Sequence, residues 1–349
     1  MTIVMRHYKK ISKCVATTFP KAIKTCLWML KITLPISLLV RLMQYYGVMD
    51  VIGTATSSLF PLLGLPAESA VVFFTSCCLP IYAPIALMAT IDLTIRQATI
   101  LSLMCLVSHN LPVECAIAKK TGSSFTTIFI LRVSSSVILA IVANMLLPED
   151  ARVFTLTESC VDHSSIYDVV TVWLVSSLDL AKTLGLIVTS LMLIQSLLEE
   201  YGIIRRMCRF ITPLMNIMGL SSNASFLWLV GNIVGLSYGS AIMINMVSEG
   251  KIEKYEADLA NRHLAFSHSL LEDTVLFASL GVCAWWLLLF RIPLAIIAVW
   301  ATRLSDKYWE EALREDTLFA YKHFILEHPY SHYVDQARKI MDSLLCSMR

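Results

Sequence analysis

Two short polar segments in an otherwise apolar part of the chain carry the residue types that could do chemistry. Residues 108–114 read SHNLPVE, and residues 267–273 read SHSLLED. Ionisable groups within apolar segments are costly and usually face a pathway or a partner. An imidazole there can bind a hydroxylated solute or carry a proton. We call these segments the SH elements, and their candidate solute ligands are Ser108, His109, Asn110, Ser267, His268 and Ser269.

The alternative for each histidine is a structural role, with its ring hydrogen-bonded across helices. Two copies at equivalent positions favour a functional role. A metal site is not expected, because each SH element has one histidine and Cys115 has no counterpart in the second element. The ten cysteines never form CxxC, so neither a zinc site nor a disulfide framework is indicated. We therefore expect no metal and no cofactor.

One arginine follows each SH element within a segment that is otherwise uncharged. Arg132 and Arg291 each lie 23 residues after the histidine of their element. Since exposure to lipid would be costly, each guanidinium must meet a carboxylate, backbone carbonyls or an anion. We expect a structural clamp with carboxylates of the SH elements, and direct binding of an anionic solute is the alternative. These carboxylates, which could also take up a coupling proton or cation, are Glu114, Glu272 and Asp273.

Two further apolar segments contain residues that interrupt helices. The first has Pro80 and Pro84 on either side of Tyr82, and the second has glycine at every fourth position: Gly231, Gly235 and Gly239. Both residue types free backbone groups that lipid cannot satisfy. Matching interruptions in two halves of a chain are typical of a transporter's midplane site. Close packing through small residues is the simpler interpretation. Besides Tyr82, the polar candidates for lining this site are Asn232, Ser237, Tyr238 and Ser240.

These features recur because the chain contains an internal repeat. An offset of 155 residues superposes Tyr46-Gly47 on Tyr201-Gly202 and Gly64-Leu65 on Gly219-Leu220. After four inserted residues, an offset of 159 superposes the SH elements and the two arginines. We place membrane repeats at 30–146 and 185–304. The rest comprises a basic lead-in with the start of the first membrane helix (1–29), an acidic loop with a connecting helix (147–184) and an amphipathic tail (305–349).

Composition places the repeats in a membrane. Charged residues make up 15% of the 349 residues, and residues 210–248 contain no Lys, Arg, Asp or Glu. Ordinary globular domains carry about 25% charged residues, and about 20 apolar residues span the hydrocarbon core. We predict an all-α, polytopic integral membrane protein, which excludes a soluble enzyme, a disordered chain and a coiled coil. The net charge of +2 gives no reason to expect a nucleic-acid partner.

The distribution of basic residues predicts the orientation. The lead-in is rich in lysine, so we place the N-terminus in the cytoplasm. Residues 48–63 contain no Lys or Arg, whereas the equivalent stretch 203–218 opens with Arg205, Arg206 and Arg209. Opposite bias implies oppositely oriented repeats with an odd number of crossings, so the SH segment is expected to be broken or re-entrant. The tail would then be cytoplasmic and the loop 249–262 outside, in a prokaryotic inner (plasma) membrane.

The tail differs from the rest of the chain in composition. Its apolar residues follow helical spacing and resemble a tetratricopeptide helix–turn–helix, with Pro329 ending one helix and Ser331 capping the next. One such unit cannot bury its own apolar face, so it should pack on the membrane part or on a partner. The simpler interpretation is an amphipathic cytoplasmic tail without a partner.

The SH elements, the stretch GNIVGLSYGSA and the single arginine of each repeat resemble the Gate, or nucleoside-recognition, membrane family. That family includes spore-maturation membrane proteins, the gate segments of ferrous-iron transport protein B and relatives of concentrative nucleoside transporters. The resemblance covers about 30–304 and implies an inverted-repeat transport or gating module. The chain lacks a GTPase domain and the proline–cysteine pair of the iron-transport gates, which weakens ferrous iron as cargo.

Together these features predict a transporter, or a gated translocation module, that moves a polar small solute by alternating access between two inverted repeats. We expect no enzymatic activity. A membrane-anchored scaffold that recruits a protein through its tail is the main alternative, and a membrane enzyme with His109 or His268 as base is a third. The expected partners are membrane lipid, a polar or ionic solute, a protein at the tail and a second copy of the chain.

Overall fold

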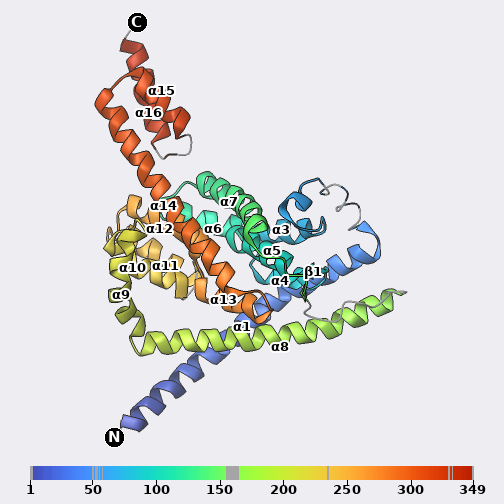
Figure 1. The fold of residues 1–349 in the computed structure, drawn as a ribbon. Helices are drawn as coiled ribbons and strands as arrows, with labels where there is room; N and C mark the ends of the chain where they lie inside the picture. Colours follow the sequence, from blue (N-terminus) through green and yellow to red (C-terminus); the bar gives the residue numbers. More distant parts are fainter. Residues whose placement is uncertain are drawn as a thin grey trace.

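The chain is almost entirely helical in a computed structural model (Figure 1), which describes residues 3–48, 51, 54, 56, 58–154, 165–233, 236–328, 331 and 333–347. The first half contains α1 (Ile3–Tyr45), η1 (Phe60–Leu63), α3 (Ser69–Cys78), α4 (Tyr82–Met88), α5 (Ile95–Ser108), α6 (Leu111–Lys120) and α7 (Phe125–Leu146). The only strands in the described part are β1 (Leu93–Thr94) and β2 (Val153–Phe154), which pair antiparallel.

The second half follows the same order and then adds the tail. It contains α8 (Ile166–Glu200), α9 (Ile203–Ile217), η2 (Ser222–Ala224), α10 (Ser225–Ile233), α11 (Leu236–Ser248), α12 (Lys254–Ser267), α13 (Leu270–Ser279) and α14 (Ala284–Glu315). The tail forms α15 (Leu318–Glu327) and α16 (Val334–Ser347). Four stretches of the described chain are long and apolar enough to cross a membrane: Ile95–Lys120, α7, α8 and α14. The predicted fold class, an all-α polytopic membrane protein, is confirmed.

Equivalent positions of the predicted repeats share backbone conformation. Gly64 and Gly219 follow η1 and α9 with φ of 74° and 72°, a left-handed conformation that glycine adopts without a Cβ penalty. Gly122 and Gly281, which precede α7 and α14, have φ of 110° and 94°. The chain therefore turns in the same way at matching points of the two halves.

The first helices of the two repeats pack antiparallel (Figure 1). Near one end of the pair the ring of His7 shares a 3.0 Å hydrogen bond with the Tyr201 hydroxyl, and near the other Trp173 Nε1 donates to Ser37 Oγ at 3.0 Å. The first helix, whose start we placed after a basic lead-in within residues 1–29, begins at Ile3, so the lead-in is itself helical. The predicted connecting helix and the start of the second repeat form one continuous helix, α8, of 35 residues, which crosses the boundary that we predicted at residue 185.

The centre of the molecule is built from α5 and α12. Every residue of α5 from Ala98 to Ser108 is buried, as is every residue of α12 from Ala257 to Ser267. A helix that is buried all round is normally apolar throughout, and α5 nearly is. The start of α12 carries charge, which led us to predict an outside loop over 249–262. That prediction is wrong from Lys254 onward, because α12 begins there and its buried charges, Asp258 and Arg262, pair with each other inside the protein.

The tail packs on the end of α14. This helix runs past the boundary that we predicted at residue 304 and carries Trp309, which is 3% exposed, to the two tail helices. The Trp309 ring lies 5.9, 5.2 and 5.0 Å from the rings of Tyr321, Phe324 and Tyr333. Burial, together with a hydrogen bond to Asp316, raises the pKa of Tyr321 to about 12. The helix–turn–helix therefore covers its apolar face with the membrane helix itself.

The predicted ends of the tail helices are close to those observed. The first tail helix ends at Glu327, and Ser331 Oγ accepts from the Tyr333 N–H at 3.4 Å. Pro329, which we expected to end the first tail helix, lies outside the described residues.

Replacing Trp309 with Ala is expected to detach the tail hairpin. Truncating a buried tryptophan costs about 3–5 kcal/mol, and three aromatic neighbours lose their contacts here. Limited trypsin digestion of the purified protein should then cut after Lys322 and Arg338 much faster than in the wild type. Phe319→Ala removes a ring that is 74% exposed and serves as the control. Equal digestion of Trp309→Ala and wild type would contradict this account of the tail.

Candidate functional site

Each SH element is a break between two helices. α5 ends at Ser108, His109 is extended, Asn110 has φ of 52°, and α6 begins at Leu111. The second element repeats this at α12 and α13, where Ser269 has φ of 50°. Positive φ is uncommon for residues other than glycine, and asparagine tolerates it best. The interruption that led us to predict a non-crossing segment is therefore present in both repeats.

The backbone freed by each break bonds to the neighbouring broken segment. The Asn110 N–H donates to the carbonyl oxygens of Ser76, at 2.9 Å, and Leu79, at 3.1 Å. The Ser269 N–H donates to the carbonyl oxygen of Gly231 at 3.0 Å. Ser76 and Gly231 are equivalent in the repeat. Each SH element thus joins the interrupted segment of its own half through the same main-chain contact.

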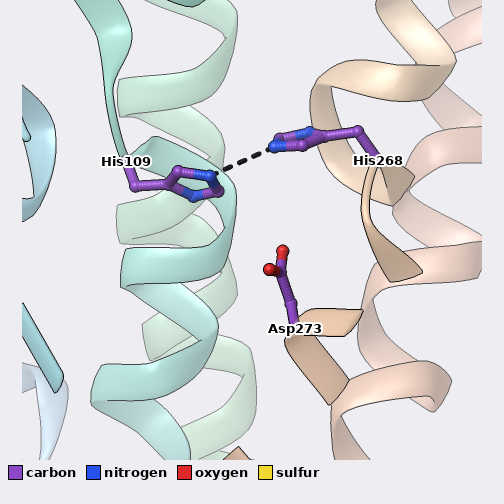
Figure 2. A group of neighbouring side chains, drawn as sticks. All are labelled: His109, His268 and Asp273. Carbon is purple, nitrogen blue, oxygen red and sulfur yellow. Dashed lines mark hydrogen bonds between the residues drawn. The ribbon is translucent and has the colours of Figure 1, made fainter. Parts of the chain in front are cut away.

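The two histidines meet across the repeats (Figure 2). His109 Nε2 and His268 Nε2 lie 3.2 Å apart, and the two side chains are buried. Each Nδ1 lies near a carbonyl oxygen one turn earlier in its own helix: that of Cys105 at 3.1 Å and that of Leu264 at 2.7 Å. A carbonyl can only accept, so each Nδ1 carries the proton and each Nε2 is turned toward the other repeat.

The arginines hold the ends of the helices that carry the histidines. Arg132 donates through Nε to the Val107 carbonyl at 2.6 Å and through Nη2 to the His109 carbonyl at 3.0 Å. Arg291 does the same with Phe266 and His268, both at 2.8 Å. The last carbonyls of a helix lack partners within it. Each guanidinium therefore satisfies main-chain acceptors that a break inside lipid would leave exposed.

The carboxylates differ between the two repeats. Glu114 Oε2 accepts from Arg132 Nη1 at 2.5 Å, and its two oxygens lie 3.2 and 3.4 Å from Nε2 of His109 and His268. Asp273 Oδ2 stays 3.8 Å from Arg291 Nη2 and has no hydrogen-bond partner among the described residues. The predicted arginine–carboxylate clamp is close in the first repeat and loose in the second.

Tyr82 connects the two repeats at the same centre. It lies at the start of α4, and its hydroxyl donates to Glu272 Oε1 at 2.7 Å. Pro80 lies in the break between α3 and α4, and Pro84 lies in the first turn of α4, where the missing N–H costs no helical bond.

Other predicted residues turn away from the histidine pair or lie outside the described part. Ser108 Oγ donates to its own helix at the Met104 carbonyl (2.7 Å), and Ser267 Oγ lies 2.8 Å from His263 Nδ1. Asn232 donates to the Trp228 carbonyl at 2.8 Å. Gly235 lies outside the described residues, as do the side chains of Ser237, Tyr238 and Ser240.

The glycines of the second half pack backbone against backbone. A Cβ on Gly239 would lie 3.3 Å from the Cα of Gly231. α10 and α11 therefore approach closely, as the packing interpretation of these glycines requires. Gly231 also supplies the carbonyl that Ser269 uses. Gly231 therefore has two roles: its small size lets the two helices approach, and its carbonyl oxygen accepts the bond from Ser269.

Sequence reasoning missed the buried polar residues in the middle of α12. Arg262 Nε donates to Asp258 Oδ2 at 2.8 Å, and both side chains are buried. Asn261 Nδ2 donates across the repeats to Thr121 Oγ1 and Ser123 Oγ, both at 2.8 Å. The available signal was the opposite charge of Asp258 and Arg262 at four-residue spacing, which is typical of a pair on one helix face.

A small cavity adjoins the histidine pair. Its volume is about 20 Å³, enough for roughly one water molecule. Glu114, Arg132, Asn261 and His268 are among the residues that line it. The centre is closed in this arrangement, since no solute larger than water fits between the repeats there.

Paired broken helices that meet at a buried polar centre, among apolar helices of membrane-spanning length, define a polytopic helical membrane protein. The chain is 31% identical over 284 residues to YvoD, an uncharacterized membrane protein of Bacillus subtilis (strain 168). That match covers 80% of this chain and 91% of YvoD. The chain belongs to the family of membrane proteins that includes YvoD. No family model matches the chain, and no solved structure matches it.

Proposed function

We propose that this membrane protein is a transporter, or a gated translocation module, that moves a polar small solute by alternating access between two inverted repeats. The observation that carries the proposal is the histidine pair, with one ring from each repeat at 3.2 Å in a buried centre. Transporters built from inverted repeats bind solutes near the midplane, where discontinuous helices meet. The resemblance to the Gate family supports the same class and does not name a solute.

The contacts between the two repeats indicate which interactions must break when one repeat moves against the other. Besides the histidine pair, Glu114 lies 3.4 Å from His268, Tyr82 bonds to Glu272, and Asn261 bonds to Thr121 and Ser123. Rocking must break these polar contacts and part of the apolar core that joins the two repeats in order to open the centre from one side. The polar side chains of the SH elements would then supply hydrogen bonds to the solute. We assign no catalytic step to any of these residues.

The antiparallel packing of α1 on α8 supports the inversion that the charge bias predicts. Equivalent helices of inverted repeats run in opposite directions through the membrane. We accordingly propose a prokaryotic inner (plasma) membrane location with both termini cytoplasmic. The lysines in the first part of α1 and the arginines of α9 are the residues that support this orientation.

Uptake by the reconstituted protein tests the proposal. A thermal-stability screen against nucleosides, nucleobases, organic anions and lipid phosphates comes first, because a ligand of the native state raises apparent stability. Uptake of the stabilising solute into proteoliposomes should fall at least about tenfold in His109→Ala and in His268→Ala, since each loses a hydrogen bond to the solute. His323→Ala, in the exposed part of the tail, should keep wild-type uptake. Unchanged uptake in both site variants, with folding intact, would rule out this mechanism.

A further inference from the structure

The histidine pair brings together atoms that can only accept hydrogen bonds. With Nδ1 of each ring donating to a backbone carbonyl, each neutral ring presents an unprotonated Nε2 to the other at 3.2 Å. The two Glu114 oxygens, at 3.2 and 3.4 Å from these nitrogens, add further acceptors. Facing lone pairs repel unless a cation lies among them.

The spacing of the two nitrogens fits a shared metal ion. Zinc bonds to imidazole nitrogen at 2.0–2.1 Å with tetrahedral angles, which places two such nitrogens about 3.3 Å apart. The observed separation is 3.2 Å. Metal-ligating histidines also usually donate their other N–H to a carbonyl or carboxylate, which fixes the ring. Both rings have that bond, to Cys105 and Leu264.

Asp273 supplies a third ligand. One ligand atom from each of His109, His268 and Asp273 lies within 4.8 Å of the others. The Asp273 carboxylate points toward the gap between the rings (Figure 2), and its Oδ2 is buried without a hydrogen bond among the described residues. A proton shared by the two rings would leave this oxygen unsatisfied, whereas a metal ion between the rings would engage all three side chains after a small shift of the Asp273 carboxylate toward it. The adjoining cavity of about 20 Å³ has room for one water as a fourth ligand.

The charge around the pair also favours a cation. Glu114 and Asp273 pair with the two guanidiniums and Glu272 bonds to Tyr82, which leaves a formal charge of −1 on the five groups. Arg132 donates a hydrogen bond to Glu114, whereas the hydrogen bonds of Arg291 go to backbone carbonyls. Asp273 is thus the carboxylate that remains available. Imidazole ligands select transition metals over magnesium or calcium.

We propose that His109, His268 and Asp273 bind one divalent transition-metal ion, such as Zn²⁺, that joins the two repeats. From the sequence we expected no metal, because each SH element has only one histidine. The fold brings the two histidines together, so the two repeats together supply two imidazole ligands. A bound ion ties the repeats together in the closed arrangement. The inference concerns binding and holds whether or not a solute is transported.

Cobalt titration of the full chain tests this site. Purified protein in detergent is stripped with a chelator and titrated with Co²⁺, which absorbs visible light strongly when its coordination is tetrahedral. We expect one Co²⁺ per chain, displaced by Zn²⁺, and a rise in apparent thermal stability with Zn²⁺. His109→Gln and His268→Gln should each weaken Co²⁺ binding by about 100-fold or more, and Asp273→Asn by about tenfold or more. His323→Gln, in the tail, should bind as the wild type does.

Two results overturn the proposal. One is a folded wild-type protein that takes up no stoichiometric Co²⁺ or Zn²⁺, which would leave a proton as the cation between the rings. The other is unchanged Co²⁺ affinity in both histidine variants, which would place the metal elsewhere. Circular dichroism and gel filtration establish the folding of each variant. Because the assay contains no solute, failure of transport and failure of metal binding are told apart.

Discussion

Replacing Glu114 with Gln is expected to destabilise the protein by about 3–5 kcal/mol, because it removes one partner of a buried ion pair. The guanidinium of Arg132 is 1% exposed, and its closest acceptor is Glu114 Oε2 at 2.5 Å. Glutamine keeps the shape of the side chain and removes the negative charge. The positive charge then stays inside the protein without compensation, where neither lipid nor water can stabilise it.

Asp273→Asn is the matched change in the second repeat. It should lower the free energy of unfolding by about 2 kcal/mol less than Glu114→Gln does, since no hydrogen bond from Arg291 is lost. The Asp273 carboxylate is 3.8 Å from Arg291, whose Nε and Nη2 already donate to two carbonyls. Unfolding of each variant in mild detergent titrated with SDS gives the comparison, with chelator present so that metal binding plays no part. Equal losses in the two repeats would contradict the asymmetry of the clamps.

Replacing Arg132 with Met should destabilise the protein by about 3–5 kcal/mol. The double variant Arg132→Met with Glu114→Met shows whether this loss comes from the ion pair alone or also from other contacts of Arg132. If the arginine only neutralised Glu114, removing both groups would be nearly neutral, since apolar replacement of a buried pair often is. Arg132 has a second role in the structure, because it also donates hydrogen bonds to the carbonyl oxygens of Val107 and His109. Each buried acceptor left without a donor costs about 1–3 kcal/mol.

The double variant should therefore recover part of the loss and remain less stable than the wild type by about 2 kcal/mol or more. Comparing the four proteins as a double-mutant cycle separates the ion pair from the carbonyl contacts. The same SDS titration provides the measurement. Full recovery in the double variant would show that the carbonyl contacts contribute nothing to stability.

Much of the candidate site could be predicted because its residues recur at fixed, short spacings along the sequence. A histidine, a carboxylate within five residues and an arginine 23 residues later recur in both halves. Charge in an apolar segment demands a partner, so the pairing of Arg132 with Glu114 follows from membrane physics. The breaks at the SH elements follow from the same reasoning about interrupted apolar helices.

The contacts across the repeats could not be predicted, because spacing within one repeat does not say which faces meet. His109 and His268 are 159 residues apart, and their contact depends on how whole helices pack. The charged start of α12 was misplaced for a related reason. Its mixed charge is typical of a solvated loop, and only the fold shows that Asp258 and Arg262 neutralise each other inside the protein.

Both arginines bond to main-chain oxygens, and every residue type supplies a main-chain oxygen. The arginine contacts at the two breaks therefore do not depend on the side chains at 108, 109, 267 and 268, whereas the positive φ of Asn110 and Ser269 limits which residues fit there. If the proposed function holds, substitution at those four positions would change what the centre binds and leave the arginine contacts in place. Relatives that keep the two arginines and differ in these side chains should share a scaffold and differ in what they bind.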